Sequence, residues 1–192
     1  MTPDAKPDLR RAALARRASL PAAARAAFSE RLTTQGLTLA RRFRPRAVSA
    51  FYPVRDEPDT LALLALLSAE GVATALPVTG KRGEPLVFCH WRPGEPTVAG
   101  QMRIPEPLAE APALDPDLLF VPLSAFDRRG HRIGYGAGHY DRTLARLRAL
   151  KPIVAVGVAY GVAEVEAVPE GPHDQRLDYV LTDSELIEIK AG

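Results

Sequence analysis

Residues 118–158 read LLFVPLSAFDRRGHRIGYGAGHYDRTLARLRALKPIVAVGV, and this stretch decides the fold. It opens with an apolar run, Leu118 to Val121, that is typical of a buried strand and that ends at Pro122. It closes with a second apolar run, Ile153 to Val158, and a helical pattern covers Tyr140 to Leu150 between them. Because two parallel strands need a long crossover, usually a helix, this order predicts a parallel strand–helix–strand unit.

The same alternation continues on both sides of this stretch. We expect a helix through Leu61 to Glu70, capped by Thr60 and followed by Gly71 at the position where a helix-ending glycine belongs. Further strands are expected at Ala47–Tyr52, Val72–Leu76, Leu86–Trp91, Tyr179–Leu181 and Leu186–Ile189. Several of these runs are apolar throughout, which indicates strands covered on both faces. We therefore predict one layered α/β domain over residues 1–192, with a largely parallel central sheet flanked by helices.

The amino-terminal part is basic and helical. Residues 1–46 contain 11 Lys and Arg against three acidic residues, a net charge of +8, whereas the remainder carries −6. One helix is expected over Leu9 to Ala18. A second follows Ser19 as N-cap, with Pro21 in its first turn and an apolar face at Ala24, Phe28 and Leu32. This asymmetry predicts an anionic ligand for the amino-terminal part, or else an organelle transit peptide.

Composition excludes several classes of protein. The chain is 46% hydrophobic and 25% charged, which excludes a disordered tail, a collagen and a coiled coil. No apolar run approaches the ~20 residues that a membrane span requires. The single cysteine, Cys89, cannot form an intramolecular disulfide, so we expect a cytoplasmic protein. We also expect a monomer, although the sequence does not fix the oligomeric state.

The strongest chemical signal is a glycine-rich segment directly before a predicted helix. Four glycines fall within residues 130–138, among Arg128, Arg129 and Arg132. Glycine lets backbone N–H groups approach an anion closely, and the following helix presents its positive end to the same anion. Arginine forks match phosphate oxygens. The segment therefore indicates a phosphate-binding loop, the alternative being a flexible hairpin or a tight strand–helix turn.

This segment, GHRIGYGAGHYD at residues 130–141, resembles the signature of the 5-formyltetrahydrofolate cyclo-ligase (methenyltetrahydrofolate synthetase) family. Other landmarks of that family occur in the same order along the chain: Lys6-x-x-x-Arg10, Asp56-Glu57, Ile104-Pro105-Glu106-Pro107, and Val168-Pro169 through His173-Asp174 to Asp178. The resemblance spans nearly the whole chain. It implies a fold like that of the sugar-phosphate isomerases and acyl-CoA transferases.

The resemblance also implies a reaction. In the family, the formyl oxygen of 5-formyltetrahydrofolate attacks the γ-phosphate of ATP in the presence of Mg²⁺. The neighbouring nitrogen then closes the ring, and phosphate leaves. The expected products are 5,10-methenyltetrahydrofolate, ADP and phosphate.

Roles transfer from the family onto matching positions of this sequence. ATP would be held by Lys6, Arg10, Arg132, Ile133, Gly134, Tyr135, Gly136, Ala137, Gly138, His139 and Tyr140. The folate would contact Tyr52, Glu57, Tyr135, Gly136, Ala137, Gly138 and His139. Asp141 and Asp174 would bind Mg²⁺, and Arg132 and Tyr140 would act in catalysis.

Plainer interpretations of single residues stay open. Lys6 and Arg10, four apart on one helix face, could form a solvated basic surface. Asp141 could pair with a nearby arginine, and Asp174 could be a turn residue. Tyr52 could be a core aromatic at a strand end.

Two positions depart from the family pattern. His139 stands where a tyrosine is usual, and residues 101–104 lack the usual glycine, which puts the local turn in question. Two other functions compete with the cyclo-ligase: an isomerase or acyl-CoA transferase with the same anion loop, and an RNA-binding module. We expect no nucleic-acid partner, because the basic helices contain no interleaved aromatic residues.

Overall fold

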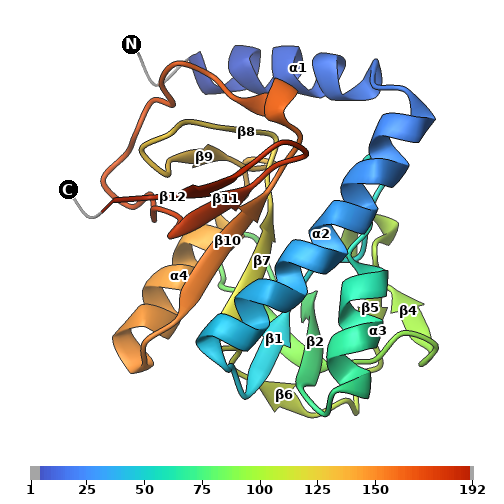
Figure 1. The fold of residues 1–192 in the computed structure, drawn as a ribbon. Coiled ribbons are helices and arrows are strands. Elements are labelled where there is room, and N and C mark those ends of the chain that lie inside the picture. The colour runs from blue at the N-terminus through green and yellow to red at the C-terminus, as the bar shows by residue number, and fades with distance from the viewer. Residues whose placement is uncertain (1–4, 191–192) are drawn as a thin grey trace.

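The computed structural model describes residues 5–190, apart from the side chain of Met102. An eight-stranded sheet with helices on both faces forms its centre (Figure 1). The elements are α1 (Ala5–Ala18), α2 (Ala22–Phe43), β1 (Ala47–Ser49), α3 (Leu61–Ala69), β2 (Ala73–Val78), β3 (Val87–His90), β4 (Thr97–Ala99), η1 (Gln101–Arg103), β5 (Pro105–Pro107), β6 (Ala113–Leu114), β7 (Leu118–Pro122), β8 (Ala125–Phe126), β9 (Arg132–Ile133), α4 (His139–Leu150), β10 (Val154–Val158), η2 (Gly161–Ala163), β11 (Tyr179–Leu181) and β12 (Leu186–Glu188).

The sheet has the strand order β12-β11-β10-β7-β1-β2-β3-β6. The five strands from β11 to β2 are mutually parallel, and β12, β3 and β6 are antiparallel to their neighbours. The predicted largely parallel sheet is therefore confirmed. The chain between β2 and β3, residues 79–86, is too short for a crossover helix, so β3 returns antiparallel.

The sheet is buried on both faces, which explains its continuous apolar strands. Along β7, Leu118 and Phe120 pack with α2 and α3, whereas Leu119 and Val121 pack with α4. Gly36 of α2 permits close packing of the two helices on the first face. A Cβ at Gly36 would lie 2.5 Å from Cδ2 of Leu63. No helix within residues 5–190 is long and apolar enough to cross a membrane.

Helix α1 lies outside this layered arrangement. It runs across the end of the sheet where β8 and β9 lie, as Figure 1 shows. Its buried Ala13 packs with Ala125, Ile133 and Val168 in a small separate cluster. These residues belong to segments that follow the parallel strands, so α1 covers the carboxyl end of the sheet, where open α/β folds bind ligands.

Some predicted boundaries are wrong. Ser19 does not cap α2. Its hydroxyl donates to the carbonyl of Arg16 at 2.8 Å and so ends α1, and Pro21 occupies the N-cap of α2. Thr60 does stand at the N-cap of α3, but its hydroxyl donates to the carbonyl of Phe51 instead of to the helix. The first strand stops at Ser49 and does not reach Tyr52.

The turn at residues 100–104, which lacks the family's glycine, contains a residue in an unfavourable backbone conformation. Arg103 has φ +58°, in the left-handed region that side chains other than glycine rarely adopt. The backbone N–H of Arg103 donates to the carbonyl of Gly100, and Gly100 N–H donates to the carbonyl of Ile104 at 2.9 Å. These hydrogen bonds hold the turn although its sequence does not favour it.

We expect Arg103→Gly to raise the free energy of unfolding by about 0.5–1 kcal/mol, because glycine adopts φ > 0 without steric penalty. Urea unfolding of the two proteins measures the difference. Arg82→Gly is the matched control, since Arg82 has no positive φ and the same change there should lower stability. A loss of stability in Arg103→Gly as large as that in the control would contradict the strain.

Candidate functional site

Three segments that hold most of the predicted site residues lie at the carboxyl end of the parallel strands. They are residues 53–59 after β1, residues 127–141 after β8, and residues 168–178 before β11. Side chains of α1 contact all three.

The glycine-rich loop has the conformation that its sequence predicts. Gly136 has φ +96°, and Gly138, the N-cap of α4, has φ +67°. A Cβ at Gly136 would lie 3.4 Å from a guanidinium nitrogen of Arg10, and a Cβ at Gly138 would lie 2.6 Å from one of Arg142. At Gly134 a Cβ would meet nothing within 4 Å. Gly136 and Gly138 are therefore required by backbone conformation, whereas Gly134 borders open space.

Helix α1 brings its two predicted phosphate ligands to this loop. Nε of Arg10 donates to the carbonyl of Gly134 at 2.7 Å. One helical turn earlier, Nζ of Lys6 lies 2.6 Å from Oδ2 of Asp174. Both side chains of that ion pair are about a quarter exposed, at 27% and 25%. The loop, α1 and Asp174 therefore meet at one place.

Arg132 and Asp141 form a second ion pair, deeper in the protein. Nη2 of Arg132 lies 2.8 Å from Oδ1 of Asp141, and its Nη1 donates to the carbonyl of Gln175. The backbone N–H of Gln175 donates to the same oxygen of Asp141 at 3.1 Å. Burial lowers the pKa of Arg132. This pair ties the glycine-rich loop and α4 to the segment that carries Asp174.

Glu57 is held by the loop on the other side of the site. The Tyr135 hydroxyl donates to Oε1 of Glu57, and the backbone N–H of Val54 donates to its Oε2 at 3.0 Å. Burial raises the pKa of Glu57. Burial together with the negative charge of Glu57 raises the pKa of Tyr135 to about 12. Tyr135 therefore remains a donor at neutral pH.

Tyr140 has a hydroxyl that is buried and has no hydrogen-bond partner among the described residues. Burial raises its pKa, so the hydroxyl stays protonated. An unsatisfied buried donor is costly, and its occurrence beside Arg132 is consistent with a place for a ligand oxygen.

The remaining predicted site residues take no part in these ion pairs, and each has contacts of its own. The ring of His139 makes a 2.8 Å hydrogen bond through Nδ1 with the carbonyl of Glu84. Ile133 is buried in the cluster under α1, so only its backbone is available. The carbonyl of Ala137 accepts from Arg142 at 3.2 Å. Tyr52 packs edge-on against Trp91, with ring centroids 6.2 Å apart.

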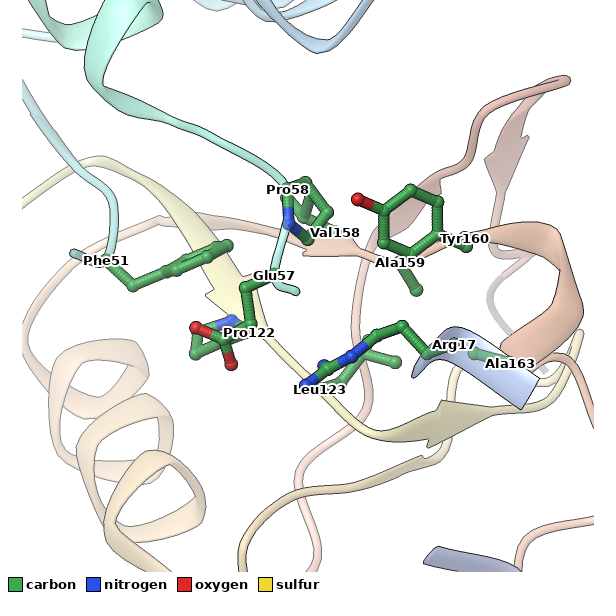
Figure 2. A pocket seen from close by; sticks show the side chains of 10 residues that line it. All are labelled: Arg17, Phe51, Glu57, Pro58, Pro122, Leu123, Val158, Ala159, Tyr160 and Ala163. Carbon is green, nitrogen blue, oxygen red and sulfur yellow. The ribbon is translucent and has the colours of Figure 1, made fainter. Parts of the chain in front are cut away.

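Sequence reasoning missed one well-buried charge at the site. Arg17 is 5% exposed, and its Nε and Nη2 contact the two carboxylate oxygens of Asp56 at 3.1 and 3.2 Å. The spacing could have revealed it, because Lys6, Arg10 and Arg17 share one face of α1 with Ala13. Arg17 also lines a pocket with Glu57 and Tyr160 at the ends of β1, β7 and β10 (Figure 2).

The carboxylates of Asp141 and Asp174 fit a Mg²⁺ ion that also binds phosphate oxygens. No cluster of three His, Cys, Asp or Glu occurs within the described residues, so the protein alone offers no complete coordination shell. Within residues 5–190, hydrogen bonds to Asp141 fall on Oδ1 and those to Asp174 fall on Oδ2. One oxygen of each carboxylate is left for an ion, and Mg²⁺ commonly uses one or two carboxylates together with substrate phosphates.

The raised pKa of Glu57 has a consequence for stability. The folded state holds the Glu57 proton more tightly than the unfolded state. The free energy of unfolding therefore falls as pH rises from the pKa of Glu57 in the unfolded chain to its higher pKa in the folded protein. Relative to the wild type, Glu57→Gln should therefore become more stable as pH increases from 5 to 8, measured as Tm.

Glu95→Gln is the opposite control. Burial alone would raise the pKa of Glu95, but hydrogen bonds from Arg92 hold that pKa below its usual value. This variant should lose stability relative to the wild type as pH rises toward the ordinary glutamate pKa of about 4.3, and should show no trend from pH 5 to 8. The same trend in both variants would rule out a raised pKa at Glu57.

Comparison with known proteins identifies the family. The sequence model of the 5-formyltetrahydrofolate cyclo-ligase family matches residues 2–183. The 5-formyltetrahydrofolate cyclo-ligase of Mycolicibacterium smegmatis is 35% identical over 189 residues, covering 95% of each chain. That of Escherichia coli K12 is 34% identical over 146 residues, covering 73% of this chain and 80% of its own.

The fold is similar to that of solved members. The NMR structure of 5,10-methenyltetrahydrofolate synthetase from Aquifex aeolicus superposes with a TM-score of 0.81 at 26% identity, covering 98% of this chain and 94% of that one. With a family match over residues 2–183 and a 35% identical relative that covers 95% of this chain, the chain belongs to the 5-formyltetrahydrofolate cyclo-ligase family, a family of ligases.

Proposed function

We propose that this chain cyclises 5-formyltetrahydrofolate to 5,10-methenyltetrahydrofolate, consuming ATP with Mg²⁺ and releasing ADP and phosphate. Membership of the cyclo-ligase family supports the reaction. The observation that carries the proposal is the meeting of Arg10 with Gly134 and of Lys6 with Asp174 at one place. This arrangement gathers cations, loop N–H groups and carboxylates as phosphoryl transfer requires.

The chemistry requires activation of a poor leaving group. The formyl oxygen attacks the γ-phosphorus of ATP, and the bond between that phosphorus and the bridging oxygen breaks to give ADP. The neighbouring nitrogen then attacks the formyl carbon and loses its proton. Phosphate departs with the former formyl oxygen, which leaves the methenyl bridge. No protein nucleophile is needed, so the protein contributes positioning and charge.

The phosphate groups would lie between α1 and the glycine-rich loop. Lys6 and Arg10 supply charge from α1, and the backbone N–H groups of residues 133–139 supply donors at the positive end of α4. Asp141 and Asp174 would hold Mg²⁺ through their second oxygens. When bound, the ion neutralises charge on the phosphate oxygens.

The folate would lie on the other side of the loop. Glu57 and Tyr135 are joined there by a hydrogen bond. Tyr52 and Glu57 both follow strand β1. We assign the folate to this side because Glu57 supplies an acceptor and Tyr135 a ring that is half exposed. Gly136, Ala137, Gly138 and His139 would then lie between nucleotide and folate.

Two side chains are suited to stabilise charge that develops during transfer. Arg132 is a buried cation held in place by Asp141, so it needs no reorganisation when the phosphate becomes more negative. Tyr140 offers the buried hydroxyl described above. We assign both to catalysis on this ground.

The proposal is tested with purified protein, 5-formyltetrahydrofolate and MgATP. We expect the near-ultraviolet absorbance of the methenyl product to rise with equal ADP release, and both to stop without Mg²⁺. ADP release must depend on the folate, which separates this activity from an isomerase or acyl-CoA transferase. No absorbance gain beside an active control cyclo-ligase would reject the proposal.

Gly136→Val tests the loop as a nucleotide site. Valine disfavours φ > 0, and its Cβ would press on the Arg10 guanidinium, so ATP affinity should fall at least tenfold. Isothermal titration with a non-hydrolysable ATP analogue measures the affinity. Gly83→Val, at a positive φ in the loop between β2 and β3, is the control and should bind normally. Normal affinity in Gly136→Val would show that the loop does not bind the nucleotide.

A further inference from the structure

Two side chains hold the Asp56–Glu57 turn from outside: Tyr135 donates to Glu57, and the buried Arg17 pairs with Asp56. The turn follows β1 and has only short-range backbone support, from Glu57 N–H to the carbonyl of Val54 at 3.1 Å. Arg17 comes from α1, 39 residues away in sequence, and grips both oxygens of Asp56. Figure 2 shows Arg17 and Glu57 reaching the same pocket from different elements.

Arg17 also contacts the glycine-rich loop. Its Nη2 lies 3.5 Å from the hydroxyl of Tyr135, and that hydroxyl donates to Glu57. One guanidinium therefore bridges the two segments assigned to the folate. A lysine could not repeat this arrangement, because its three donors radiate from one atom, whereas the arginine fork matches a carboxylate with two nitrogens.

Burying such a charge is unfavourable unless it is fully paired. Arg17 is only 5% exposed. If its role were packing alone, a hydrophobic residue of similar size would stabilise the protein as well as the buried arginine does. A paired buried charge does, however, fix the direction of its partners, which is what a binding site needs.

We propose that Arg17 is a positioning residue for the folate: its buried guanidinium fixes the Asp56–Glu57 turn and the Tyr135 hydroxyl so that Glu57 faces the substrate. The proposal rests on the proposed function for the identity of the ligand. It assigns Arg17 no contact with the folate or the nucleotide. Lys6 and Arg10, nearer the start of α1, serve the nucleotide instead.

The kinetic test compares Arg17→Met with Arg11→Met. Arg11 is on the same helix, is exposed and pairs only with Asp8 in the described structure, so it is a matched control. We expect Arg17→Met to raise KM for 5-formyltetrahydrofolate about tenfold or more, with KM for ATP within about twofold. Arg17→Lys should recover only part of the loss, and Arg11→Met should behave as wild type.

A second readout does not depend on activity. Hydrogen exchange of residues 53–58 should be faster in Arg17→Met and in Asp56→Asn than in wild type, and unchanged in Arg11→Met. Where Arg17→Met fails to fold, Arg17→Lys and Asp56→Asn carry both measurements.

The outcomes separate the two proposals. Wild-type protein without cyclising activity would refute the proposed function, and exchange at residues 53–58 would still decide the role of Arg17. With active wild type, an unchanged KM for 5-formyltetrahydrofolate would overturn the positioning role. Equal increases in both KM values, or unchanged exchange in Arg17→Met, would overturn it as well.

Discussion

One face of α1 determines whether the site exists. Three cationic side chains on that face each contact a different segment at the carboxyl end of the sheet: Lys6 with Asp174, Arg10 with Gly134, and Arg17 with Asp56. Ala13, on the same face, buries its methyl group completely and sets how closely the helix approaches. Without α1 these segments would keep only the contacts among themselves, such as Arg132 with Asp141 and Tyr135 with Glu57. With α1 docked they become the walls of one site.

The charges at this site are arranged in pairs that limit each other. Arg132 and Asp141 neutralise one another in the protein, and Lys6 does the same for Asp174. Such pairing offsets the desolvation cost of burying the charges and keeps each charge with its own partner. In the proposed function, a triphosphate with its metal would bring both signs of charge. It would replace the partners of Lys6 and Asp174 without leaving either unpaired, while Arg132 stays paired with Asp141.

The fold was largely predictable because its apolar runs are long and bounded by clear signals. Leu118 to Val121 are buried on alternate faces, as a continuous apolar strand predicts. Local capping was less predictable. The Ser19 hydroxyl could serve either the end of one helix or the start of the next, and only the three-dimensional path of the chain decides between them.

The candidate site was predictable where a residue carries a rare backbone or lies in a recognisable motif, as with Gly136 and Gly138. Arg17 was only partly predictable: its spacing from Lys6, Arg10 and Ala13 places it on one face of α1, but the sequence does not show what that face contacts. Its burial depends on Asp56 and Tyr135, which lie 39 and 118 residues away. Side chains whose role is to connect distant segments leave little trace in short sequence patterns.

The ion pair between Lys6 and Asp174 joins residues 168 positions apart. During synthesis on the ribosome, α1 is made long before the carboxylate that receives its lysine. Closing so long a loop is entropically costly and slow. A nascent or truncated chain that ends before residue 174 therefore lacks one wall of the candidate site. In the proposed function, nucleotide binding would wait until that residue has been added to the chain.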